Sequence, residues 1–203
     1  MNVSDFIRAY HDDAKRSETR TGIPALFSLA QSALESGWSA HKPGNAMFGI
    51  KAAGGWHGKR QLLKTREVFA DRAQGHRFPE VISITPRADG KFDYIVRDWF
   101  RAYDSPAQSF DDHAAMLRGN ARYAKAFETA DPREFARRIA AAGYATDPNY
   151  AASLIAVIAT LEKALPGAAP SSPHSADLRR SQVASAAPKP SFFARLAALF
   201  GRR

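Results

Sequence analysis

The 203-residue chain contains no cysteine, which excludes a disulfide scaffold, a zinc or iron–sulfur site with cysteine ligands, and a thiol nucleophile. It also lacks a long apolar segment. The most hydrophobic stretch, residues 154–161, is far shorter than the roughly 20 residues that cross a membrane. Charged side chains occupy the N-terminal positions where a signal peptide is apolar. We therefore expect synthesis in the cytoplasm and, for any action outside it, a separate route of release.

Several patterns that carry chemistry are missing as well. The chain has no G-x-S-x-G elbow, no Walker A loop and no G-x-G-x-x-G motif. Its six histidines are never three or four positions apart, so no helix presents a local pair of metal ligands. We expect neither a metal nor a cofactor.

Positive charge is in excess but unevenly distributed. The net charge is +9, and residues 166–203, with six basic side chains and one acidic side chain, supply +5 of it. The remaining +4 on the first 165 residues argues against a basic groove there. Six basic residues in the terminal segment are too few for a nucleic-acid arm, so we expect no nucleic-acid partner.

Composition divides the chain into three segments. Residues 1–165 have the apolar content of one folded domain, and residues 166–190, rich in Pro, Ala and Ser, are typical of a linker. Residues 191–203 form a short segment that, as a helix, gathers Phe and Leu on one face with Arg at its margin. Such a cationic amphipathic helix suits an anionic membrane or lipopolysaccharide. The alternatives are a helix that docks on the domain and a tail that aids solubility.

Apolar periodicity predicts two helices at the start of the domain. The first is capped by Ser4 and ends before Gly22. The second has Pro24 in its first turn and stops at Gly37. Residues 39–60, rich in glycine and polar side chains, are expected to form a loop.

A change of period after this loop indicates a small antiparallel sheet. We expect a strand at 65–69 and two strands, 81–84 and 92–96, joined by a turn at 88–90. Three helices follow: the first is capped by Ser109 or Asp111, the second opens with a capping box at 131–134, and the third runs from 147–148 to about 165. Helices, a sheet and helices again predict an α+β fold with two lobes.

The most informative segment is the end of the second helix. Glu35 lies in its last turn, just before Gly37 and Trp38. The negative end of a helix and an apolar aromatic neighbour both favour the protonated carboxyl, which is the form that a general acid needs. The alternative is a solvated glutamate beside Gln31 and Ser32 on a polar face.

Several ordered motifs resemble glycoside hydrolase family 73, the bacterial peptidoglycan N-acetylglucosaminidases that include flagellar rod-assembly hydrolases and autolysins. The first two are residues 30–38 (AQSALESGW) and 45–51 (NAMFGIK). They are followed by 65–67 (TRE), 100–103 (FRAY), 112–113 (DH), 142–148 (AGYATDP) and Tyr150. The resemblance covers about residues 4–163.

This resemblance implies a lysozyme-like fold with a substrate groove between a helical lobe and a small β lobe. It implies that Glu35 is the general acid and that Glu67, in the Thr-x-Glu context of the β lobe, is the second carboxylate. The family pattern continues with an aromatic residue and Asn-Gly, whereas residues 68–70 here are VFA, so Glu80 is the alternative.

The resemblance also implies contacts with the substrate. Tyr144 matches the tyrosine that lines the cleavage subsite of the family. Four further residues either line the groove or pack in the core and loops, and we hold both roles open: Trp38, Asn45, Phe48 and Tyr150.

The implied activity is cleavage of the β-1,4 bond between N-acetylglucosamine and N-acetylmuramic acid in peptidoglycan, by a monomer. Retention, inversion and attack by the substrate's acetamide all stay open, because the distance between the carboxyls decides between the first two. With the cationic C-terminal segment, we expect a phage or prophage endolysin of a Gram-negative host that reaches the periplasm through a holin. The alternatives are an exported housekeeping wall remodeller and a wall-binding protein without turnover.

Overall fold

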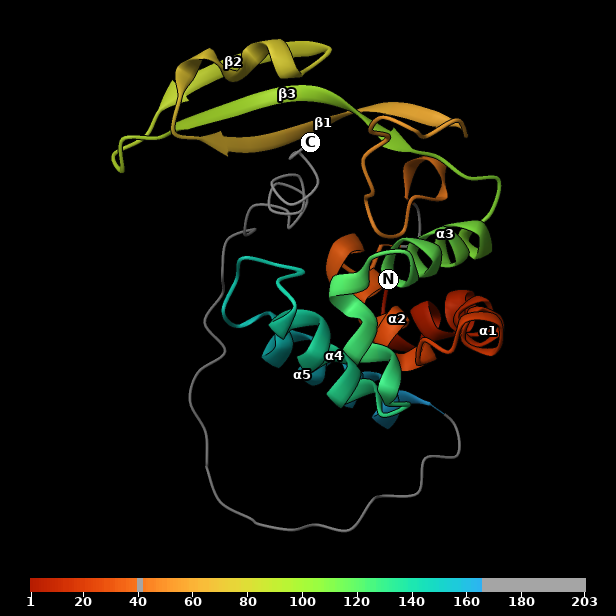
Figure 1. The fold of residues 1–203 in the computed structure, drawn as a ribbon. Helices are drawn as coiled ribbons and strands as arrows, with labels where there is room; N and C mark the ends of the chain where they lie inside the picture. The colour runs from red at the N-terminus through yellow and green to blue at the C-terminus, as the bar shows by residue number, and fades with distance from the viewer. Residues whose placement is uncertain (40–41, 166–203) are drawn as a thin grey trace.

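The computed structural model describes residues 1–39 and 42–165, in which helices and a three-stranded sheet form separate layers (Figure 1). The expected linker at 166–190 and the cationic segment at 191–203 lie outside the described residues and stay predictions. Within the described part of the chain, no helix has both the length and the apolar character needed to cross a bilayer.

Two helices open the domain, α1 (Val3–Thr21) and α2 (Ala25–Ser36). The predicted cap at Ser4 is wrong: Asn2 caps α1, and its side chain accepts a hydrogen bond from the backbone N–H of Asp5 at 2.8 Å. The cap must be the extended residue before the first helical one, and Asn2 has that backbone. Gly22 and Gly37 end the two helices as predicted, with left-handed φ values of 75° and 60°.

The sheet consists of β1 (Arg60–Phe69), β2 (Glu80–Pro86) and β3 (Phe92–Arg101), in the order β1-β3-β2 and antiparallel throughout. The predicted hairpin between β2 and β3 is confirmed. The first strand begins at Arg60, five residues earlier than predicted, because the whole of β3 is available to pair with it. A 3-10 segment, η2 (Arg72–Arg77), which we did not predict, connects β1 to β2.

Three helices return after the sheet: α3 (Pro106–Arg118), α4 (Pro132–Ala141) and α5 (Tyr150–Ala164). Short 3-10 segments are η1 (Pro43–Asn45) and η3 (Ala121–Glu128). The predicted caps of α3 are wrong, because Ser105 caps this helix while Ser109 and Asp111 lie inside it. Asp131 caps α4 as predicted, and its carboxylate accepts from the N–H of Glu134 at 2.7 Å.

The core of the domain surrounds α2, which packs against α1, α4 and α5. Helix α2 carries ten buried residues out of twelve and therefore has almost no solvated face. Apolar burial of this extent is the main favourable term in folding. It also means that polar side chains on α2, Glu35 among them, are inside the protein.

The loop from residue 42 to residue 52 fastens the sheet to the helices. On the helical side, the N–H of Met47 donates to the hydroxyl of Ser109 in α3 at 3.1 Å, and Phe48 stacks on His113 of α3 with ring centroids 3.9 Å apart. On the sheet side, the loop exchanges backbone hydrogen bonds with β3. The α+β fold class is thus confirmed, and this loop bonds to both of its parts.

Candidate active site

Glu35 lies in the last turn of α2 and is 5% exposed. Its Oε1 atom has no hydrogen-bond partner among residues 1–39 and 42–165. Burial raises the pKa of this carboxyl to about 8, against an ordinary value of 4.5. The alternative of a solvated glutamate is wrong, because Gln31 and Ser32, its supposed polar face, are buried as well. The carboxyl is therefore protonated at neutral pH.

Lys42 moderates this effect. Its ammonium donates to the backbone carbonyl of Glu35 at 3.1 Å and so binds the negative end of α2. Its positive charge lowers the pKa of the Glu35 carboxyl, although by less than burial raises it. Burial in turn lowers the pKa of Lys42, while the carboxyl of Glu35 raises it.

A buried polar cluster lies beneath the acid. Gln31, one turn before Glu35 on α2, donates from Nε2 to the hydroxyl of Tyr150 at 2.6 Å. The ring of Tyr150 stacks on Tyr144 at 5.6 Å and 12°, and the Tyr144 hydroxyl lies 3.4 Å from Nε2 of His113. The pKa of both tyrosines rises through burial and, to a lesser extent, through the charge of Glu35. The structure thus brings both tyrosines to the proposed acid.

The side chains of the predicted substrate-binding residues make contacts inside the protein. Tyr144, Tyr150 and Phe48 are fully buried. Trp38 packs edge-on against Phe6 of α1, with centroids 5.2 Å apart. The side-chain amide of Asn45, a residue with a left-handed φ of 52°, donates to the carbonyl of Tyr103 at 3.0 Å. Direct contact of these residues with a sugar stays a prediction.

Glu67 lies in β1 and is 2% exposed. Its Oε1 atom accepts from the ammonium of Lys51 at 2.8 Å, and that ammonium also contacts Asp98 at 2.7 Å. Burial raises the pKa of Glu67, and Lys51 opposes this rise by its charge and its hydrogen bond. Asp98 raises the pKa further and Arg77 lowers it, both more weakly.

The register of the sheet separates Glu67 from Glu80. Side chains alternate between faces, so Glu67 shares a face with Thr65, whereas Lys64 points to the other. Arg97 of β3 pairs in register with Lys64 of β1 on one side and with Glu80 of β2 on the other. Glu80 therefore shares a face with Lys64, and this face is opposite the one that carries Glu67. The Glu80 side chain is 51% exposed and lies 3.5 Å from the guanidinium of Arg97.

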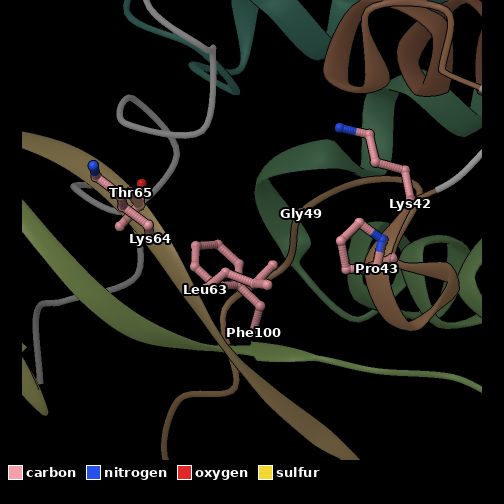
Figure 2. Close-up of a pocket in the computed structure, with 8 residues that line it drawn as sticks. Lys42, Pro43, Gly49, Leu63, Lys64, Thr65 and Phe100 are labelled. Carbon is pink, nitrogen blue, oxygen red and sulfur yellow. The ribbon is translucent and has the colours of Figure 1, made fainter.

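A pocket of about 110 Å³ lies between the loop and the sheet (Figure 2). Its apolar wall includes Leu63 of β1 and Phe100 of β3, and Lys42 extends its side chain from the loop on the other side. Thr65, two residues before Glu67 on the same face, also lines the pocket. The pocket therefore lies between the segment that contacts Glu35 and the strand face that carries Glu67.

Three residues of this site were missed by sequence reasoning: Gln31, Lys42 and Lys51. Gln31 and Lys51 lie inside the motifs at 30–38 and 45–51, which is the signal that could have found them. Lys42 lies outside both motifs, and its position depends on the path of the loop. Within the described ranges, no group of three or more His, Asp and Glu side chains could hold a metal ion.

Two buried carboxyls, one at a helix end and one on a small antiparallel sheet, are the kind of groups with which lysozyme-like glycoside hydrolases work. The family model Glucosaminidase, described as mannosyl-glycoprotein endo-β-N-acetylglucosaminidase, matches residues 11–163. The chain belongs to this family of glycoside hydrolases. The resemblance to glycoside hydrolase family 73 is thereby confirmed.

Known relatives agree with this assignment. The chain is 31% identical over 165 residues to the peptidoglycan hydrolase FlgJ of Salmonella typhimurium, an alignment covering 78% of this chain and 46% of that protein. The chain thus spans less than half of that relative. The solved structure of the glycoside hydrolase domain of the same protein is 29% identical in sequence, with a TM-score of 0.61. The match covers 80% of this chain and 90% of that domain.

The peptidoglycan hydrolase from Sphingomonas sp. A1 is similar as well. Its crystal structure matches with 31% sequence identity and a TM-score of 0.58. The match covers 84% of this chain and 98% of that one. The predicted lysozyme-like fold is therefore confirmed.

The buried acid has a consequence for stability that needs no substrate. The unfolded carboxyl loses its proton near pH 4.5 and the folded one near 8, so folding is penalised progressively between these values. The full difference corresponds to roughly 5 kcal/mol. Glu35→Gln should therefore unfold at higher urea than the wild type at pH 9, with the advantage disappearing at pH 4. The exposed Glu128→Gln is the control, and parallel pH–stability curves for wild type and Glu35→Gln would refute the assigned burial.

A second prediction concerns Lys42. Because its charge lowers the pKa of Glu35, Lys42→Met should raise that pKa by roughly one unit. Carboxyl ¹³C NMR titration of Glu35 measures the shift directly, with the exposed Lys163→Met on α5 as control. An unchanged or lowered Glu35 titration in Lys42→Met would contradict the assigned interaction.

Proposed function

We propose that the chain is an endo-β-N-acetylglucosaminidase that cleaves the β-1,4 bond between N-acetylglucosamine and N-acetylmuramic acid in peptidoglycan. The observation that carries this proposal is the burial of Glu35, which keeps a carboxyl protonated at neutral pH at the helix end that Lys42, a residue lining the pocket, contacts. Glu67 is the second carboxyl of the proposal. Its place on the pocket-side face of β1 favours it over Glu80.

The proposed reaction begins with proton transfer from Glu35 to the glycosidic oxygen. The bond from the anomeric carbon to that oxygen breaks, its electron pair leaves with the oxygen, and positive charge develops on the sugar ring. The carboxylate of Glu67 stabilises this charge and supports attack at the anomeric carbon. Water, the acetamide oxygen of the substrate and Glu67 itself are the three candidate nucleophiles.

The biological setting that we propose is an exported housekeeping wall remodeller. The support is the similarity to bacterial proteins named as peptidoglycan hydrolases, among them FlgJ. This support favours the remodeller over the endolysin that the C-terminal segment had suggested. The proposal includes action on the wall in the periplasm, a monomeric state, and contact of residues 191–203 with anionic lipid or lipopolysaccharide.

The direct test of the proposal is digestion of purified peptidoglycan with mass spectrometry of the reduced ends. New reducing N-acetylglucosamine supports it, and new reducing N-acetylmuramic acid would make the protein a muramidase. A folded protein that binds the wall but releases no reducing ends would instead be a binding protein.

Glu35→Gln should lower turnover in this assay by at least about a hundredfold, the usual scale for loss of a general acid. The same substitution should leave the fold intact, which thermal unfolding checks. Glu128→Gln, on an exposed glutamate, should keep wild-type turnover. Near-normal release of reducing ends by folded Glu35→Gln would end the assignment of the acid.

The two candidates for the second carboxyl are separated by a matched pair of variants. Glu67→Gln should reduce turnover, because it removes the carboxylate on the pocket-side face. Glu80→Gln should retain it, because that side chain is on the opposite face. Turnover by Glu67→Gln together with loss of activity in Glu80→Gln would show that the second carboxyl is misassigned.

A further inference from the structure

Backbone contacts hold Lys51 against β3. The N–H of Ala52 donates to the carbonyl of Trp99 at 2.9 Å, and the carbonyl of Ile50 accepts from the N–H of Arg101 at 2.9 Å. These bonds tie the loop to β3 on both sides of Lys51, which itself forms an isolated bridge with Phe100. The backbone of Lys51 is therefore fixed at the sheet, within reach of the carboxylates that its ammonium contacts.

The ammonium of Lys51 joins two carboxylates that the sheet alone keeps apart. Glu67 pairs in register with Tyr94, and Asp98 pairs with Leu63, four positions away along each strand. Lys51 contacts both acids, at 2.8 Å and 2.7 Å, and its ammonium lies 5.6 Å from the ring centre of Phe78. The Coulomb attraction within ion pairs that are this shielded from water is stronger than in surface pairs.

We propose that Lys51 is a positioning residue that holds Glu67 as an oriented carboxylate on the pocket-side face of the sheet, and that Asp98 limits how tightly Lys51 binds it. This inference rests on the proposed function, in which Glu67 supports attack at the anomeric carbon. A buried carboxyl without such a partner takes up a proton and loses the charge that this role requires. Asp98 shares the ammonium and so leaves Glu67 with only part of its attraction.

Besides burial, three charged groups act on the protonation of Glu67. Lys51 comes from the loop, Asp98 from β3 and Arg77 from η2. Lys51 and Arg77 lower the pKa of Glu67, while Asp98 raises it. Removing Lys51 and removing Asp98 should consequently shift the titration of Glu67 in opposite directions, which a purely structural role for either residue does not predict.

The experiment follows the Glu67 carboxyl by ¹³C NMR titration and, in parallel, the acid limb of the pH–activity profile. Lys51→Met should move both to higher pH by about 1–3 units, because an opposite charge in contact is lost. Asp98→Asn should move both to lower pH, and Lys51→Arg should restore values near those of the wild type. Lys91→Met, on the exposed turn between β2 and β3, removes an equal charge and should move neither.

The outcome separates this inference from the proposed function. Shifts of the same sign in Lys51→Met and Asp98→Asn, or no shift in either, would overturn the positioning role even if Glu67→Gln abolishes turnover. Absence of turnover in the wild type would defeat the proposed function, while the NMR titration still decides whether Lys51 controls Glu67. If Lys51→Met fails to fold, the direction of the Asp98→Asn shift decides.

Discussion

Burial of one carboxyl at the end of α2 is the constraint on which the rest of this site depends. Glu35 loses solvation because α2 is covered by α1, α4 and α5. Keeping the acid protonated therefore lowers the free energy of unfolding at neutral pH, since the carboxyl ionises freely in the unfolded chain. Strained or desolvated groups of this kind persist where the surrounding packing is strong enough to hold them.

Each of the two buried carboxyls has one lysine near it, and both lysines oppose the rise in pKa that burial causes. In the helical part, Lys42 bonds the backbone carbonyl of Glu35, so burial dominates and the acid keeps its proton. In the sheet, Lys51 bonds the carboxylate of Glu67 directly and opposes the effect of burial. The two sites therefore differ in the group that the lysine bonds, which is the backbone carbonyl at Glu35 and the carboxylate itself at Glu67.

The local features of this fold could be predicted from the sequence to a useful degree. The glycine stops at Gly22 and Gly37, the cap at Asp131 and the hairpin around residues 88–90 depend on neighbouring residues alone. The caps of α1 and α3 were placed wrongly, because several residues near each helix start are able to cap it. The early start of β1 was missed because it depends on its partner β3.

The sequence by itself determined where helices stop, which residues alternate along strands, and that Glu35 ends an apolar helix. Backbone sterics and hydrogen bonds over three or four residues decide such features. Only the tertiary structure decided which polar and charged side chains face each other. Lys51 and Glu67 are 16 positions apart and Gln31 and Tyr150 are 119 apart. Electrostatic interactions depend on distance and burial in space, which no pattern of spacing along a single chain contains.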